Sequence, residues 1–487
     1  MNGVPKKRIA VIGGGGAAGL AALRVFVDRP ELKGPNAPWE IHAFEARKDI
    51  GGMWMNEDPG ESVVYSGYDD PVPPTPLYNS LTTMGPHPIM AFHDFLFPPS
   101  TSLFPPASHV LDYLRAYADH FDLRRHIRFL TSVESLRWNT EISKWELIAV
   151  EGDKDKRPVK GLYDAMIFAN GSYRKPRLPS IPGIGEWEGT GRKFTHAVSY
   201  REPSPFRGLN VLVVGAGPTG MDISNELTQT ARVVYRSAPG ASRTDEGAIL
   251  MRGRVIALHP EDNRVDYEDG TSDTGIEHII FATGYTFSFP SMEGLVPDAN
   301  APLDCPLPDH LFSSTSHIYP LARHIFPLRD YSPRTLAFVG LPTLLVPFPT
   351  FEDQSQAIAT IFLNGDKLDR AAEEAKISER YNILHKQSKS KLSYIAEQWH
   401  RFRHGDPELE DQFEYRRELL ALAGKKGWEV QSWEAQVWGD TPVMRKEWAK
   451  LVKSGVSEDW VRGVGEKGVG EWVELMHKVV QHAKQQH

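Results

Sequence analysis

The chain has 487 residues, of which 40% are hydrophobic and 24% charged, and its formal net charge is -8. These values are ordinary for a globular protein of two or three domains, and the acidic balance argues against nucleic acid or an anionic membrane surface as partner. Because Cys305 is the only cysteine, the chain cannot form an intramolecular disulfide, which favours a reducing compartment. A single cysteine also excludes the dithiol centre of a disulfide reductase.

The first predicted elements form a strand, a glycine turn, a helix and a second strand. Residues 9–12 are a short apolar run that ends in glycines, which is typical of a buried parallel strand and not of a signal peptide. A helix is expected over 17–27 and a strand over 39–44. Because no stretch reaches about 18 continuous apolar residues, we expect a soluble, cytoplasmic protein without a membrane span.

The next segment, 59–106, is rich in proline and aromatic residues and is expected to be irregular but ordered. A helix over 110–121 has apolar residues at helical spacing. Further strands are expected over 127–133, 145–150 and 164–169, before a proline-rich crossing at Pro176, Pro179 and Pro182.

A second strand–turn–helix–strand unit follows the crossing. Its expected elements are a strand over 211–214, a helix from about 219, and strands over 233–236 and 277–282, and another buried strand covers 336–339. From 366 onward helical periodicity and charge dominate, with a break at 405–407, and seven of the 12 tryptophans follow residue 390. This tail is read as a helical cap, and the chain shows no repeat of fixed period.

The first glycine turn fits the dinucleotide motif G-x-G-x-x-G, whose glycines let the backbone approach a pyrophosphate at a helix N-terminus. The next strand ends at Glu45, an acid suited to the ribose hydroxyls. An extra glycine allows two registers, of which we prefer Gly14, Gly16 and Gly19 over Gly13, Gly15 and Ala18.

The second turn carries Gly215, Gly217 and Gly220. The strand after it ends in Arg236 instead of an acid, which favours the 2′-phosphate of NADPH over NADH, with Arg243 as a second candidate. Two dinucleotide units in one chain indicate one resident dinucleotide and one reductant, which points to a flavin enzyme reduced by a nicotinamide.

Several motifs in order between about residues 8 and 365 resemble the flavin-containing monooxygenase family. They read FEARKDIGGMW, LYNSLTTMGPHPIMAFHDFLFP, IRFLTSV, FANGSYRKPRLPSIPG, FTHAVSY, FATGY, LAFVGLP and FPTFEDQS. The resemblance implies FAD contacts at Gly14, Gly16, Gly19, Glu45, Gly52, Met53, Trp54, Thr83, Val133, Asn170, Gly171 and Gly340. It implies NADPH contacts at Tyr173, Gly215, Gly217, Thr219, Gly220, Arg236, Ser237, Thr283, Gly284 and Tyr285.

Three features depart from the family pattern. Thr83 is followed by Met84, where the family has an asparagine, and a thioether is only a weak hydrogen-bond acceptor. Gly189 lies seven residues before His196, so the family fingerprint that ends at Tyr200 is stretched. The first glycine turn also holds one residue more than the motif requires.

The resemblance implies that NADPH reduces FAD, that the reduced flavin forms a C(4a)-hydroperoxide with O₂, and that one oxygen atom passes to a small molecule. The atom oxygenated is expected to be a nucleophilic nitrogen or sulfur, with carbon as a further alternative. Because the cofactor does this chemistry, no acid–base pair is required. Met84, His196 and Tyr173 are candidate catalytic residues, with a packing role as the alternative for His196. His317 and His324 are too isolated to indicate a metal site.

The predicted fold is α/β, with two Rossmann-like domains of the three-layer ββα type and a helical C-terminal cap. The FAD domain covers 1–178 and 290–365, the inserted NADPH domain 179–289, and the helical region 366–487. Alternatives are a Baeyer–Villiger monooxygenase, which usually has tryptophan where Tyr200 stands, an N-hydroxylating monooxygenase, and an uncoupled NADPH oxidase or non-oxygenating flavoprotein. The pattern leaves room for a homodimer.

Overall fold

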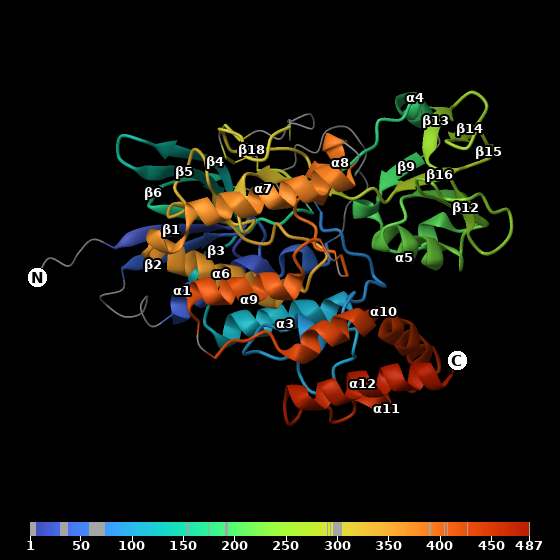
Figure 1. Cartoon of the computed structure of the whole chain (residues 1–487). Coiled ribbons are helices and arrows are strands. Elements are labelled where there is room, and N and C mark those ends of the chain that lie inside the picture. The colour runs from blue at the N-terminus through green and yellow to red at the C-terminus, as the bar shows by residue number, and fades with distance from the viewer. Residues whose placement is uncertain are drawn as a thin grey trace, which may run out of the picture. The chain divides into compact units, whose positions relative to one another are not determined.

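The chain folds into two units, each built on a five-stranded parallel sheet, as the computed structural model shows (Figure 1). Unit 1 comprises 1–54, 82–171 and 287–487, and unit 2 comprises 55–81 and 172–286. The described residues are 6–29, 38–57, 74–152, 155–173, 175–189, 193–289, 291–292, 294–295, 304–388, 391–403, 405–406, 408–425 and 427–486.

The parallel sheet of unit 1 has the strand order β22-β7-β1-β2-β3. Its strands are β1 (Lys7–Ile12), β2 (Trp39–Phe44), β3 (Ile127–Arg128), β7 (Ala165–Phe168) and β22 (Leu336–Phe338). A three-stranded antiparallel sheet covers one face and consists of β4 (Thr131–Asn139), β5 (Lys144–Glu151) and β6 (Arg157–Tyr163). The predicted single strand over 127–133 is wrong, because Leu130 adopts a φ of 51° and divides it between the two sheets.

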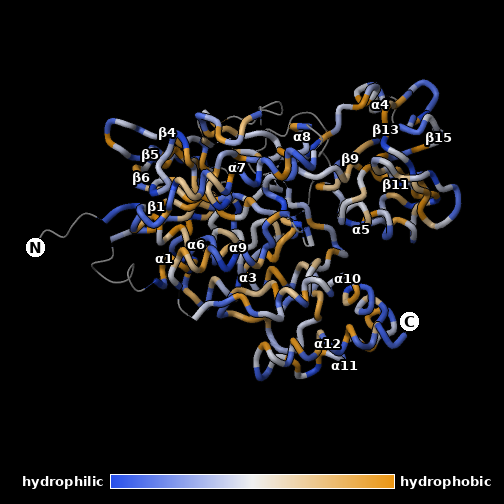
Figure 2. Tube along the Cα trace, in the orientation of Figure 1, coloured by the Kyte–Doolittle hydropathy of each residue, from blue (hydrophilic) through white to orange (hydrophobic). Residues whose placement is uncertain are grey.

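Helices cover the opposite face of this sheet. They are α1 (Ala17–Asp28), α3 (Ala107–His120) and α6 (Pro347–Leu363), and α1 and α6 lie side by side (Figure 1). Since successive side chains of a strand point to opposite faces, β1 serves both layers. Ile9 and Val11 pack with the helices, whereas Ala10 and Ile12 pack with the antiparallel sheet. Figure 2 shows hydrophobic residues concentrated among these strands and helices.

Unit 2 repeats this three-layer design. Its parallel sheet has the order β12-β11-β10-β16-β9 and is formed by β9 (Lys193–His196), β10 (Asn210–Val214), β11 (Val233–Ser237), β12 (Leu250–Arg252) and β16 (His278–Phe281). One face packs against α5 (Pro218–Leu227). The other packs against an antiparallel sheet of β13 (Val255–His259), β14 (Arg264–Tyr267) and β15 (Ser272–Thr274). The predicted ββα architecture is therefore confirmed for both units.

The C-terminal helices belong to unit 1. They are α7 (Arg370–Gln387), α8 (Leu392–Gln398), α9 (Gln412–Ala423), α10 (Ser432–Lys453), α11 (Ser457–Val461) and α12 (Val469–Gln485). Shorter elements are η2 (Gly52–Trp54), α2 (His87–Met90), η3 (Arg124–His126), β8 (Lys175–Pro176), α4 (Ile184–Gly189), η4 (Ala197–Ser199), η5 (Ser204–Phe206), β17 (Tyr285–Thr286), β18 (Phe312–Ser313), β19 (Ile318–Tyr319), β20 (Leu321–Ala322), β21 (Phe326–Pro327) and η6 (Gly365–Lys367). Among the described residues, no helix is both long and apolar enough to cross a membrane.

The predicted irregular segment over 59–106 falls partly outside the described residues, which resume at 74. From there to 106 the chain holds only the single-turn helix α2 besides turns and isolated bridges. Its apolar side chains are nevertheless buried, as Leu77, Phe92, Phe97 and Phe104 show. The prediction of an irregular but ordered segment is thus confirmed for the described part.

Candidate active site

The first glycine turn is packed so closely that most of its glycines have no room for a side chain. Gly13 follows β1 with a φ of 88°, and a Cβ atom there would lie 2.6 Å from the carbonyl oxygen of Ala169. A Cβ atom at Gly19 would lie 2.2 Å from the Gly13 oxygen. Gly16 is the N-cap of α1 and makes no side-chain cap, so the first N–H groups of the helix point at the space beside the turn.

The second turn has the same construction in unit 2. Gly215 has a φ of 126°, and its Cβ atom would lie 2.3 Å from the Ala282 oxygen. Gly217 is the N-cap of α5. A Cβ atom at Gly220 would lie 2.2 Å from the Gly215 oxygen.

The two turns correspond at three positions. Gly13 matches Gly215 as the positive-φ residue directly after the strand, while Gly16 and Gly19 match the two later glycines. The first turn is therefore one residue longer, and its conformation combines both sequence registers. A Cβ atom at Gly14 would lie 2.5 Å from that of Ala43, so this position also requires glycine.

Glu45 lies directly after β2, beside the first turn. Its buried carboxylate accepts hydrogen bonds from the backbone N–H of Gly15 at 2.9 Å and of Arg47 at 2.9 Å. The segment η2 also touches this turn, because Gly51 donates its N–H to the Gly15 carbonyl and Gly52 approaches Gly16. The acid and the glycines predicted to contact FAD thus share one end of the sheet.

Three of the other residues predicted to contact FAD lie at the carboxyl ends of neighbouring strands. Asn170 and Gly171 follow β7, and Gly340 follows β22 with a φ of 82° and its N–H donated to Gln354 Oε1 at 2.9 Å. Carboxyl ends of parallel strands are where such sheets bind ligands. Val133 is half-buried in β4, Thr83 is buried, and Met53 and Trp54 lie in η2, where Trp54 meets Phe348 at 6.5 Å.

Arg236 is the residue that the sequence predicts to bind the 2′-phosphate of NADPH. It lies in β11, and its Nε is a buried nitrogen without a hydrogen-bond partner in the described part of the chain. The alternative, Arg243, is ion-paired with Asp273 at 3.0 Å and with Asp245 at 3.1 Å. Thr219 is half-buried in the first turn of α5, and the Ser237 hydroxyl donates to the Gly253 carbonyl at 2.7 Å.

Thr283, Gly284 and Tyr285 follow β16, and a fourth predicted residue, Tyr173, contacts the last of them. The Thr283 hydroxyl donates to the Arg177 carbonyl, Gly284 has a φ of 79°, and the half-exposed ring of Tyr173 meets Tyr285 at 5.3 Å.

His196 is held by backbone groups on both ring nitrogens. Nδ1 accepts the Val198 N–H at 3.1 Å, which assigns the proton to Nε2, and Nε2 donates to the Gly284 carbonyl at 3.1 Å. Burial lowers the pKa of His196 to about 4, so the ring is neutral near pH 7. These contacts favour the packing role over proton transfer. Met84 belongs to unit 1, whereas Tyr173 and His196 belong to unit 2.

A buried series of ion pairs, which was not predicted from the sequence, joins the C-terminal helices to the rest of unit 1. His93 Nε2 pairs with Asp353 Oδ1 at 2.7 Å, Asp353 Oδ2 with Arg416 at 2.7 Å, and Arg416 with Glu434 at 2.5 Å. Burial alone would raise the pKa of Asp353, but His93 and Arg416 outweigh it and lower that pKa. The chain joins the segment before α3 to α6, α9 and α10.

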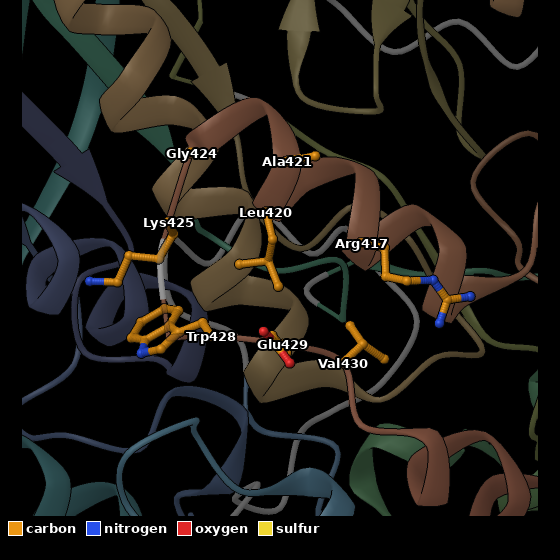
Figure 3. Close-up of a pocket in the computed structure, with 8 residues that line it drawn as sticks. All are labelled: Arg417, Leu420, Ala421, Gly424, Lys425, Trp428, Glu429 and Val430. Atoms are coloured by element: carbon orange, nitrogen blue, oxygen red, sulfur yellow. The ribbon is translucent and has the colours of Figure 1, made fainter.

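A surface cleft of about 540 Å³ lies next to these ion pairs, at the end of α9 and the linker that follows it (Figure 3). Trp428 forms part of its wall, donates to Asp94 Oδ2 at 3.0 Å and stacks on His93 at 4.5 Å. The remaining lining residues are Arg417, Leu420, Ala421, Gly424, Lys425, Glu429 and Val430. None of these was predicted as a site residue.

The sequence model described as "Flavin-binding monooxygenase-like" matches residues 6–245 and 238–396. The chain belongs to this family. The resemblance inferred from the motifs is thereby confirmed, and the chain is a member of an enzyme family. The C-terminal residues beyond 396, which include α9 to α12, lie outside the match.

Two curated relatives and one solved structure are similar to this monooxygenase. The flavin-containing monooxygenase FMO GS-OX-like 3 of Arabidopsis thaliana is 32% identical over 377 residues, 72% of this chain and 75% of that protein. The thiol-specific monooxygenase of Saccharomyces cerevisiae is 31% identical over 364 residues, 73% of this chain and 77% of that protein. The S-allyl-L-cysteine S-oxygenase from Allium sativum shares the fold, with a TM-score of 0.74, 24% identity and 99% of both chains covered.

Proposed function

We propose that this chain is an FAD- and NADPH-dependent monooxygenase that transfers one atom of O₂ to a nucleophilic sulfur, or alternatively nitrogen, of a small molecule. Family membership supports a flavin-dependent oxygenation. The yeast relative is a thiol-specific monooxygenase, and the Allium sativum neighbour is an S-oxygenase of S-allyl-L-cysteine, a thioether. These two activities favour sulfur as the reacting atom.

The observation that carries the proposal is the pair of glycine turns, each too tight for a Cβ atom at its first and last glycine and each opening a helix at the carboxyl end of a parallel strand. This cradle fits a pyrophosphate, because the helix N–H groups and dipole favour an anion there. In unit 1 the carboxylate of Glu45 suits FAD, and in unit 2 the guanidinium of Arg236 suits the 2′-phosphate of NADPH.

When bound, FAD supplies hydride acceptance and oxygen activation. The chain itself would hold the phosphates at the two helix ends, and it places the carboxyl group of Glu45 beside the first turn. In unit 2, the neutral ring of His196 holds the backbone at Gly284 by its Nε2 proton. The protein's part is therefore binding and orientation, and none of these groups has to move a proton.

The proposal is tested by turnover under ¹⁸O₂. The purified protein is first assayed for released FAD, and then incubated with NADPH and a panel of thiols, thioethers, amines and ketones. We expect ¹⁸O in a sulfur product, found by mass spectrometry. Label in an ester would identify a Baeyer–Villiger enzyme instead. NADPH consumption with stoichiometric H₂O₂ and no labelled product would establish the oxidase, the alternative favoured by the exposed Met84.

Arg236→Gln is expected to weaken the binding of NADPH without weakening the binding of NADH. Loss of a charge-assisted contact to the 2′-phosphate should raise the KM for NADPH by about 10- to 100-fold. Steady-state oxidation of each coenzyme measures both constants. The control is Arg207→Gln, at an exposed position of the same unit. Equal changes for NADPH and NADH in the Arg236 variant would contradict the assignment.

A further inference from the structure

Gly340, a predicted flavin contact, lies beside the first turn of α1. A Cβ atom at Gly340 would lie 3.6 Å from that of Ala18, the second residue of this helix, and 3.2 Å from the ring of Phe351. Gly16 is the N-cap of the same helix and belongs to the turn that is proposed to hold the pyrophosphate. The backbone of Gly340 therefore borders the proposed flavin site.

Gln354 is a fully buried residue of α6, and both ends of its side-chain amide form hydrogen bonds. Oε1 accepts the Gly340 N–H at 2.9 Å, and Nε2 donates to the Tyr415 hydroxyl at 2.8 Å. The orientation of the amide follows from these partners, since a backbone N–H can only donate and must face the amide oxygen. The amide nitrogen then faces Tyr415, whose hydroxyl has to accept.

Tyr415 can accept this hydrogen bond because its own proton has another partner. The hydroxyl donates to the Arg323 carbonyl at 2.8 Å, which leaves its lone pairs for the Gln354 amide. Burial raises the pKa of Tyr415, so the hydroxyl keeps its proton at neutral pH. The three hydrogen bonds therefore run in one direction, from the Gly340 N–H to the Arg323 carbonyl.

Helix α9, which carries Tyr415, is held on α6 by other contacts as well. The two helices lie side by side (Figure 1). Arg416 forms the buried ion pair with Asp353, and the Tyr415 ring packs against Phe402 with a centroid distance of 5.0 Å. Loss of the Tyr415 hydroxyl alone should therefore leave the helix in place. Helix α9 lies beyond residue 396, outside the family match.

We propose that Tyr415 is a positioning residue of the flavin site, which fixes the Gln354 amide so that its oxygen holds the Gly340 backbone for FAD. This role rests on the proposed function, in which unit 1 binds FAD. Without the hydroxyl, the Gln354 amide would be a buried donor that has lost its acceptor, and its rotation would release the Gly340 N–H. A purely structural tyrosine would stabilise the fold without acting on Gly340.

Hydrogen exchange of the Gly340 amide tests these hydrogen bonds without any cofactor. Exchange is followed by mass spectrometry in flavin-free protein, on a peptide fragmented so that this amide is resolved. We expect Tyr415→Phe to accelerate the exchange by about 10-fold, the effect of one lost buried hydrogen bond. The matched control is Tyr113→Phe, in the same core, where the hydroxyl accepts the Phe92 N–H at 2.8 Å and donates to the Phe95 carbonyl at 2.6 Å. The control should leave the Gly340 exchange unchanged.

A double-mutant cycle separates positioning from general packing. Gln354→Met preserves the length of the side chain but removes the amide, and the Gly340 exchange should again be faster. Adding Tyr415→Phe to Gln354→Met should cause no further acceleration, because the hydroxyl acts on Gly340 only through the amide. Equal acceleration by Tyr415→Phe with and without the amide would indicate a general loosening of the core and would overturn the proposal.

Titration of the flavin-free protein with FAD measures the consequence for the site. We expect the FAD dissociation constant of Tyr415→Phe to lie about 5- to 10-fold above that of the wild type. An unchanged constant or an unchanged Gly340 exchange in this variant would overturn the positioning role and leave the proposed function standing. A wild-type protein that binds no FAD would overturn both.

Discussion

Gly19→Ala is expected to yield a protein without bound flavin. Its Cβ atom would stand 2.2 Å from the Gly13 carbonyl oxygen, a distance that forces the backbone of the turn to move. The displaced turn would lose the close backbone approach that a pyrophosphate needs. The measurement is the amount of flavin released per mole of purified protein.

Gly220→Ala makes the corresponding change in unit 2, where its Cβ atom would stand 2.2 Å from the Gly215 oxygen. This variant should keep its flavin, but NADPH should no longer reduce that flavin and bleach its absorbance. Each variant thus serves as a folding control for the other, since each should retain the cofactor of the unaltered unit. Gly185→Ala, whose Cβ atom would meet nothing within 4 Å, should retain both functions. A flavin-free Gly220→Ala protein would contradict the separate assignment of the two turns.

The second large effect is loss of stability in acid, caused by buried histidines. Burial lowers the pKa of His87 to about 3 and the pKa values of His196, His278 and His317 to about 4. Burial also places the pKa values of His324 and His400 well below the ordinary value. These rings are neutral in the folded protein at pH 7, whereas in the unfolded chain histidine titrates near about 6.5.

The direction of the effect follows from proton binding. Below about pH 6.5 the histidines of the unfolded chain bind protons, whereas the buried rings of the folded protein bind them only near their lowered pKa values. The contribution of these rings to the free energy of unfolding is therefore complete above about pH 6.5 and falls as the pH drops toward 4. Each such histidine costs about 1.4 kcal/mol per pH unit within this window. Several together rival the whole stability of a typical domain, so we expect acid unfolding near about pH 5.

Urea unfolding midpoints measure this effect. They are determined at a series of pH values from about 7.5 to about 5, a range that spans the reference pKa of histidine. His317→Gln removes one titrating ring and should flatten the loss of unfolding free energy by about 1.4 kcal/mol per pH unit. His109→Gln, at an exposed position of α3, is the control and should leave the slope near that of the wild type. A His317 variant with the wild-type slope would refute the assignment.

The sequence by itself determined the two strand–turn–helix units and their family, because glycine spacing and short apolar runs are local signals. The strand at 39–44 was predicted with its observed bounds, and the helix from 17 was one residue short. The individual strands of the antiparallel sheet in unit 2 were not predicted, since short half-exposed strands such as β15 carry little periodic signal.

Only the tertiary structure decided which glycine takes the positive φ. That residue is Gly13, where a side chain would collide with the carbonyl of Ala169, a residue distant in sequence. The tertiary structure likewise decided that His196 is held by two backbone groups, that Arg243 is ion-paired, and that Arg236 Nε has no hydrogen-bond partner among the described residues. The contact of Arg445 with Met84 joins residues 361 positions apart. Hydrogen bonds and burial of this kind depend on packing between remote segments, which no local pattern of residues encodes.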